Sequence, residues 1–108
     1  MPTLFLKPLI TQEQQSKGFQ FCCQPKFLNQ GLLFIYDCEK DMAFHMNNVS
    51  FDIDIIFLNE NKIVVDFFTM HSGSGKTYKP HCKCKYAIEL PKGVLQKFKI
   101  QKNKRLNF

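Results

Sequence analysis

Short apolar segments separated by polar turns run through the middle of the chain, and no other feature constrains its fold as strongly. Residues 31–36, 51–58, 63–68 and 85–90 each have the length of a strand and carry aromatic or β-branched side chains. The polar residues 59–62 join the second run to the third, which predicts a β-hairpin. Many short strands linked by polar turns are typical of a mainly β fold. The sequence therefore predicts a small antiparallel, barrel-like domain.

Two further elements are predicted near the beginning of the chain. Residues 3–7 are expected to form a first strand. Thr11 and Gln14 have the spacing of a capping box, which predicts a short helix over about 12–17 that Gly18 ends.

The other end of the chain carries weaker signals. Pro91 is well placed to begin a second short helix with Val94, Leu95 and Phe98 on one side. Residues 105–108 are expected to close the sheet as a last strand. The predicted β domain therefore has one or two short helices.

Length and composition limit the class of protein. A chain of 108 residues fits one domain, residues 1–108, and 44% hydrophobic residues predict a packed core. No apolar run approaches the roughly 20 residues that span a bilayer, and residues 1–8 break up too soon for the apolar core of a signal peptide. We therefore expect a cytoplasmic protein without membrane contact, whose cysteines are reduced thiols.

Positive charge is concentrated in the last third of the chain. Residues 1–66 carry five basic and eight acidic residues, a net charge of −3, whereas residues 67–108 carry ten basic residues and one acid, a net charge of +9. Such a region could meet nucleic acid or an acidic partner, which is the alternative function. Fourteen of the fifteen basic residues are lysines, however, and nucleic-acid readers rely on arginine, so a solvated surface is the simpler interpretation. The alternative would use Lys76, Lys79, Lys83, Lys85, Lys97, Lys99, Lys102, Lys104 and Arg105.

One segment imitates a nucleotide-binding motif. Residues 73–77 (GSGKT) resemble the end of a phosphate-binding loop, but Met70 stands where the motif needs glycine. Pro80 also opposes the helix that should follow the loop. We therefore expect a flexible turn and no nucleotide.

The cysteines raise the question of a metal or a reactive thiol. Residues 81–84 (HCKC) lack the spacing and the second ligand pair of a zinc site. Alternate residues of a strand share a face, which predicts a core role for the cysteines and no metal. The adjacent Cys22 and Cys23 are likewise interpreted as packing residues, because nothing pairs them with a base. The predicted apolar side comprises Cys82, Cys84, Tyr86, Ile88 and Leu90, and the opposite side Lys83, Lys85 and Glu89.

From Gly18 onward, several segments resemble, in order, the linked motifs of one family. Residues 18–22 (GFQFC) resemble "GLMFR", and residues 31–36 (GLLFIY) resemble "GMLFVF". Residues 44–59 (FHMNNVSFDIDIIFLN) resemble "FWMKNTxIPLDIIFID", and residues 86–93 (YAIELPKG) resemble "YVLELPAG". On these motifs the chain resembles the uncharacterised family "domain of unknown function 192", or uncharacterised protein family 0127, over about residues 17–108.

The resemblance implies a compact, mainly β, barrel-like fold with short helices, and no activity is established for the family. Five replacements change the chemistry of distinctive motif positions in this chain. Cys22 replaces Arg, His45 replaces Trp, Asn47 replaces Lys, Val49 replaces Thr and Asp52 replaces Pro. If these positions line a ligand cleft, the chain has lost two cations there, and an anion held by them would bind less well.

We expect a non-enzymatic domain that binds an unknown small ligand or a protein partner and uses no cofactor. We lean against an enzyme because the sequence shows no nucleophile–base–orienter set; a catalytic site would have to join Asp54 to His45 or to a cysteine. The signature segment could bring aromatic, thioether and amide groups beside a carboxylate. Alternatively, Phe44, Met46 and Asn48 only pack and cap a loop. The expected binding residues are Cys22, Phe44, His45, Met46, Asn47, Asn48 and Asp54.

Overall fold

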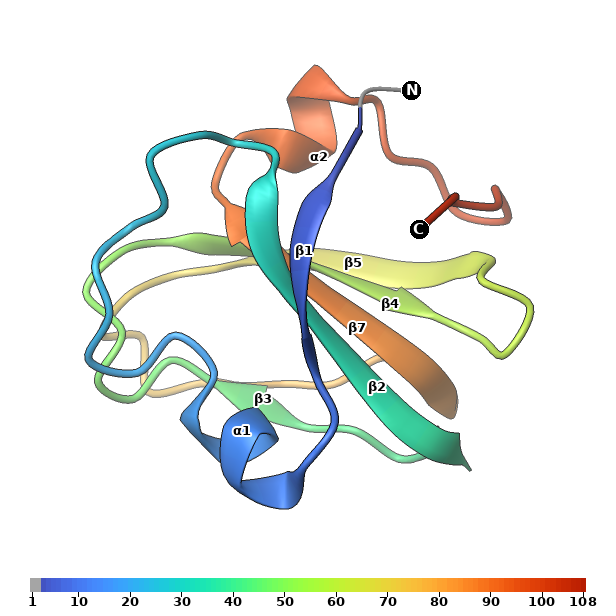
Figure 1. Cartoon of the computed structure of the whole chain (residues 1–108), viewed down its shortest axis with the longest axis horizontal. Coiled ribbons are helices and arrows are strands. Elements are labelled where there is room, and N and C mark those ends of the chain that lie inside the picture. Colours follow the sequence, from blue (N-terminus) through green and yellow to red (C-terminus); the bar gives the residue numbers. More distant parts are fainter. Residues whose placement is uncertain (1–2) are drawn as a thin grey trace.

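The computed structural model describes residues 3–108 and shows a mainly β fold (Figure 1). Within these residues, a five-stranded sheet has the order β1-β2-β7-β4-β5, β3 pairs with β6, and two helices are short. The predicted mainly β class with short helices is confirmed. No helix of residues 3–108 has the length and apolar character needed to cross a membrane. The elements are β1 (Phe5–Leu9), α1 (Gln12–Lys17), β2 (Gln30–Lys40), β3 (Phe44–His45), β4 (Ile53–Leu58), β5 (Val64–Met70), β6 (Thr77–Tyr78), β7 (Cys84–Pro91) and α2 (Val94–Lys97).

The main sheet is mixed, which corrects the prediction of a purely antiparallel one. β1 pairs with β2 in parallel, whereas β7 runs antiparallel to both β2 and β4, and β4 runs antiparallel to β5. A parallel pair needs a long crossover, and α1 with the loop after it supplies this connection (Figure 1). β1 and β5 end the strand order, so the sheet is open and "barrel-like" describes it only loosely.

Both faces of the main sheet are buried, each by its own apolar cluster. On the α1 face, Phe34 and Phe57 pack with Phe19, which follows α1 in the chain. On the α2 face, Ile88 packs with Val94 of α2. All six residues of β4 are buried, as expected of a strand covered on both sides. The predicted hairpin of β4 and β5 is confirmed.

The first helix is capped as predicted and is tied to the sheet by one polar side chain. The Gln14 backbone N–H donates to Thr11 Oγ1 at 3.1 Å, and the Thr11 backbone N–H donates to Gln14 Oε1 at 3.1 Å. No residue of α1 itself is buried. Instead, Gln15 Nε2 donates to the backbone oxygens of Leu9 at 3.0 Å and Ile35 at 2.8 Å.

Three element boundaries differ from the prediction. β1 includes Pro8, which an edge strand tolerates because the missing N–H need not pair inside a sheet. Pro91 is the last residue of β7, and α2 begins only at Val94. The last four residues, predicted to be a strand, contribute only an isolated bridge between Arg105 and Ile63.

The central strand β7 departs from its predicted alternation. It begins at Cys84, so Cys82 lies outside the strand and is exposed. Ile88 and Leu90 pack on the α2 face as predicted, whereas Cys84 packs on the α1 face. Glu89 points away from the α2 face as predicted, but a second layer covers that side too, and Glu89 is buried.

Gly31 lies where β2 passes closest to β7, and a side chain is not accommodated there. An added Cβ would overlap the backbone oxygen of Glu89 and lie 2.7 Å from Leu90 Cδ2. Because the central strand is held on both sides, we expect Gly31→Ala to lower the free energy of unfolding by about 3 kcal/mol or more. Urea denaturation measures this loss.

Gly73→Ala is the matched control for this prediction. No atom lies within 4 Å of a Cβ at Gly73, and its φ of +73° adds only the left-handed penalty, ~1 kcal/mol. Equal losses in the two variants would contradict the close approach at Gly31.

Candidate functional site

A pocket of about 340 Å³ lies on the α1 face of the sheet. Its walls come from α1 and the residues that follow it, from β2, and from the segment around β3, and the central strand contributes one residue, Glu89. The lining residues are Gln12, Gln15, Ser16, Lys17, Gly18, Phe19, Gln20, Phe34, Tyr36, Ala43, Phe44, His45, Val49 and Glu89.

Glu89 presents a carboxyl group to this pocket without a hydrogen-bond partner among residues 3–108. It pairs in register with Leu32 on one side and Ile55 on the other, and it is only 5% exposed. Every side-chain nitrogen or oxygen of residues 3–108 that is fully shielded from solvent has a hydrogen-bond partner. No hydrogen bond contributes to the pKa of the Glu89 carboxyl group, which burial alone shifts. The carboxyl oxygens are therefore not sealed in the core, and their remaining opening is the pocket.

The protonation of Glu89 follows from its surroundings. Burial raises the pKa of Glu89 to about 8, because a charged carboxylate is poorly solvated there. Burial also raises the pKa of Tyr36, and the charge of Glu89 adds to that rise. The carboxyl group is therefore mostly protonated at neutral pH and can both donate and accept a hydrogen bond.

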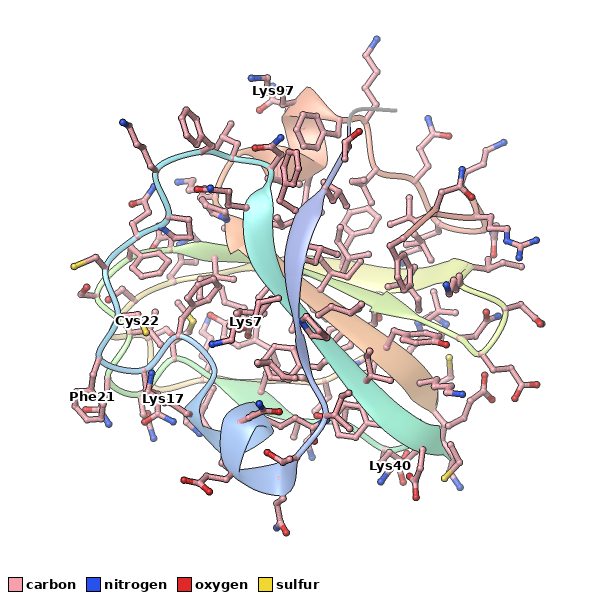
Figure 2. The ribbon with its side chains drawn as sticks, in the orientation of Figure 1. Lys7, Lys17, Phe21, Cys22, Lys40 and Lys97 are labelled. Carbon is pink, nitrogen blue, oxygen red and sulfur yellow. The ribbon has the colours of Figure 1, made fainter. Side chains whose placement is uncertain are left out.

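Aromatic rings and a glycine shape the space around this carboxyl group. Phe34 and Phe44 meet edge to face, with ring centroids 5.0 Å apart. A Cβ added to Gly18 would lie 3.5 Å from Phe34 Cζ and 3.6 Å from Glu89 Oε1, so the missing side chain leaves room beside the carboxyl group. Gly18 has a φ of +48°, which favours glycine at the end of α1. At the rim, the Lys17 ammonium lies 3.5 Å from Cys22 Sγ (Figure 2).

The family profile of DUF192, described as "Uncharacterized ACR", matches residues 6–108. The chain belongs to this family. It is also 30% identical over 87 residues to a UPF0127 protein of Thermococcus kodakarensis. That alignment covers 79% of this chain and 54% of the archaeal protein, so the DUF192 chain spans about half the length of this relative.

Two solved structures share the fold. A protein of Sinorhizobium meliloti 1021, described as "a putative transcription regulator", matches with a TM-score of 0.90 at 16% identity, over 96% of this chain and 81% of that one. A protein of unknown function from Novosphingobium aromaticivorans DSM 12444 matches with a TM-score of 0.88 at 17% identity, over 95% and 74%. At these identities the likeness shows the fold alone.

The DUF192 signature residues are divided between this pocket and its surroundings. Phe44 and His45 line the pocket. Met46 is buried in the α1-face cluster. Asn48 has a φ of +60°. It is hydrogen-bonded to the loop after α1, because its Nδ2 donates to Gln20 Oε1 at 3.1 Å and its backbone oxygen accepts from the Phe21 N–H at 2.8 Å.

The two positions where DUF192 has Arg and Lys lie beside the pocket in this chain. Cys22 is half-buried and lines a shallow hollow with Phe21 and Asn48. Asn47 is exposed, donates its backbone N–H to His45 Nδ1 at 3.2 Å, and lines a second open hollow. Both hollows adjoin the pocket, because Val49 lines all three.

Asp54 does not join the other predicted site residues. It lies on the α2 face, where its Oδ1 accepts from Thr69 Oγ1 at 2.6 Å. Its Oδ2 accepts from the backbone N–H groups of Gly93 at 2.9 Å and Leu95 at 3.0 Å. Asp54 thus holds the start of α2 on the sheet, and the carboxyl group near Phe44 is that of Glu89.

Sequence reasoning missed Glu89 because it assumed that one face of β7 meets solvent. A signal was available, since Glu89 is the only charged residue in an otherwise apolar run from Tyr86 to Leu90. A run of this kind indicates a strand buried on both faces. A charged residue inside it must then be buried as well, which makes it a candidate for function.

The predicted packing role is confirmed for Cys84, which is buried, and for the half-buried Cys22, which packs against the α1-face cluster. Burial raises the pKa of the Cys84 thiol to about 12, so it stays protonated and unreactive. Cys23, Cys38 and Cys82 are exposed. Cys23 and Cys82 lie outside the strands, and Cys38 lies in the part of β2 where the pairing with β7 shifts register. Among residues 3–108, no group of three or more His, Cys, Asp or Glu side chains could hold a metal ion.

The basic residues of the last third lie mostly at the surface. Lys102 is 3.7 Å from Asp66, and Lys97 extends from α2, away from the pocket (Figure 2). Their binding to nucleic acid or an acidic partner stays a prediction.

Removing the Asp54 carboxylate tests its attachment of α2. Asp54→Ala leaves two buried N–H groups and a hydroxyl without their acceptor, so we expect a loss of about 3 kcal/mol in the free energy of unfolding. Asp54→Asn keeps an acceptor oxygen and should lose clearly less. Urea denaturation of both variants measures the difference, and similar losses would contradict a capping role.

The raised pKa of Glu89 predicts a pH-dependent stability. The pKa of the Glu89 carboxyl group is ordinarily 4.5 and is about 8 in the folded protein. At pH values between these two, the carboxyl group is ionised in the unfolded chain and protonated in the folded protein. The contribution of Glu89 to stability is therefore lost as the pH rises through this window. Glu89→Gln cannot ionise and should avoid the loss.

Denaturant unfolding of both proteins at about pH 5 and pH 8 measures this effect. One pKa unit corresponds to ~1.4 kcal/mol, so the stability of Glu89→Gln relative to the native chain should rise by several kcal/mol over this window. A difference that is the same at both pH values would contradict the burial of an unpaired carboxyl group.

Proposed function

We propose that this DUF192 chain is a small-ligand-binding domain and that its site is the pocket above Glu89. The observation that carries the proposal is the buried carboxyl group of Glu89, which opens into the pocket without a partner in residues 3–108. Burying such a group destabilises the fold unless something bonds to it. A ligand in the pocket supplies that missing bond.

The shape of the pocket supports this role. Its volume of about 340 Å³ falls at the lower end of the range of ligand sites, ~300–1,000 Å³. Apolar rings such as Phe34 and Phe44 form part of its walls, and polar groups such as Gln20 and His45 lie among the lining residues. Small-molecule sites combine apolar walls with polar groups that orient the ligand, and the lining of this pocket contains both kinds.

Binding rather than catalysis is proposed because the pocket lacks activated chemistry. Among the described residues that line it, no nucleophile is hydrogen-bonded to a base, and His45 Nδ1 instead accepts the backbone N–H of Asn47. The Glu89 carboxyl group can accept or donate a hydrogen bond, which is sufficient to orient a ligand.

A thermal-shift screen with a small-molecule library tests the proposal. A ligand present at 100 times its Kd stabilises the protein by ~2.7 kcal/mol, so melting should shift by several degrees. We expect hits with the native chain and not with Ala43→Phe, because the added ring at this exposed lining position fills the mouth of the pocket.

Gln96→Phe is the matched control, because it adds the same ring at an exposed position of α2, on the opposite face of the sheet. Hits should persist with this variant. A library without hits, or hits that bind equally to Ala43→Phe, would overturn the proposal.

A further inference from the structure

We infer that the ligand of this pocket is a small organic cation whose ammonium group binds the Glu89 carboxylate. The inference rests on the proposed function and names the ligand class of the same site. It follows from the absence of a cation bound to Glu89 within residues 3–108 and from the aromatic rings that line the pocket with it.

Residues 3–108 supply no positive partner for Glu89. Lys17 is the lysine among the lining residues, and its ammonium lies 3.5 Å from Cys22 Sγ rather than on the carboxyl group. Lys7 of β1 pairs in register with Leu32, which in turn pairs with Glu89, but Lys7 makes no ion pair with Glu89 within residues 3–108. A carboxylate without an internal cation can be neutralised by a cation from outside.

Two donors that line the pocket close to the carboxyl group are already occupied within the protein. The backbone N–H of Gly18, the residue beside Glu89 Oε1, already donates to the Gln14 oxygen at 3.0 Å. The amide of Gln15 is likewise occupied by two backbone oxygens. An anion would therefore face a carboxyl group that repels it when ionised and offers one proton when neutral.

The aromatic walls favour a cation further. Phe34 and Phe44 lie beside the carboxyl group, and the negative faces of such rings attract an ammonium ion. Tyr36 shows this attraction already, because the Lys40 ammonium lies 5.2 Å from the centroid of its ring. A single carboxylate is too few ligands for a metal ion, which leaves an organic ammonium as the fitting cation.

Binding of a cation must remove the proton from Glu89, so affinity should rise with pH. With a pKa of about 8, the ionised fraction of Glu89 grows roughly 50-fold between about pH 6 and pH 8. The other groups that face it are Tyr36, Lys17, Lys7 and His45. Burial and the charge of Glu89 raise the pKa of Tyr36 above its ordinary value, so Tyr36 stays neutral in this window, and His45 is the lining residue replaced in the control below.

Three probes with the same four-carbon chain test the inference: butylammonium, butan-1-ol and butyrate. NMR titrations of the native chain, followed at the backbone amides of Gly18 and Tyr36, give each Kd at about pH 6 and pH 8. We expect butylammonium to bind tightest and to gain roughly 50-fold in affinity at the higher pH.

Two variants assign the pH dependence to its source. Glu89→Gln should bind butylammonium weakly and equally at both pH values, with folding checked by its unchanged amide dispersion. His45→Asn should keep the rise in affinity with pH, whatever its absolute affinity. A rise that disappears in His45→Asn and persists in Glu89→Gln would overturn the inference.

The outcomes separate this inference from the proposed function. If butan-1-ol or butyrate binds as tightly as butylammonium, the pocket binds ligands but the cation assignment is wrong. If the screen yields pocket ligands and none is a cation, the same conclusion holds. If neither the screen nor the three probes show binding, the proposed function itself fails.

Discussion

Burial of the central strand on both faces is the constraint on which the rest of the structure depends. β7 lies between β2 and β4, and apolar clusters cover it from the α1 face and the α2 face. Each β7 side chain inside the sheet must therefore fit into one of two packed layers. Gly31 is glycine because β7 passes against it. Glu89 is the residue that does not fit this rule, and the pocket is the space that accommodates it.

The sequence predicted correctly the structural features that depend on residues close together in the chain. The capping box of Thr11 and Gln14, and the hairpin of β4 and β5, depend on side chains a few positions apart, and both were predicted correctly. The parallel pairing of β1 with β2 depends on how α1 crosses the sheet, which no local pattern encodes. The candidate site depends on the same distant packing. Asp54 and Glu89 both lie in apolar strands, and only the arrangement of layers shows that one caps α2 and the other faces a pocket.

The departures from the DUF192 motif acquire a physical meaning in this arrangement. The motif has two basic residues at the positions of Cys22 and Asn47, which line the hollows next to the pocket. Neutral side chains there make the surroundings of Glu89 less positive than the motif would. Long-range attraction of anions is weakened by this change, and a cation meets less repulsion on its way in. Under the proposed function, these two substitutions favour a cationic ligand over an anionic one.

The attachment of α1 by Gln15 has a consequence for the kinetics of ligand exchange. α1 forms one wall of the pocket, yet it buries no side chain and is fixed to the sheet by amide hydrogen bonds to Leu9 and Ile35. Breaking a few such bonds exposes little apolar surface, so α1 can detach from the sheet locally while the strands stay folded. Under the proposed function, entry and release of the ligand depend on a fluctuation of one short helix, so the rate of exchange is independent of the global stability of the domain.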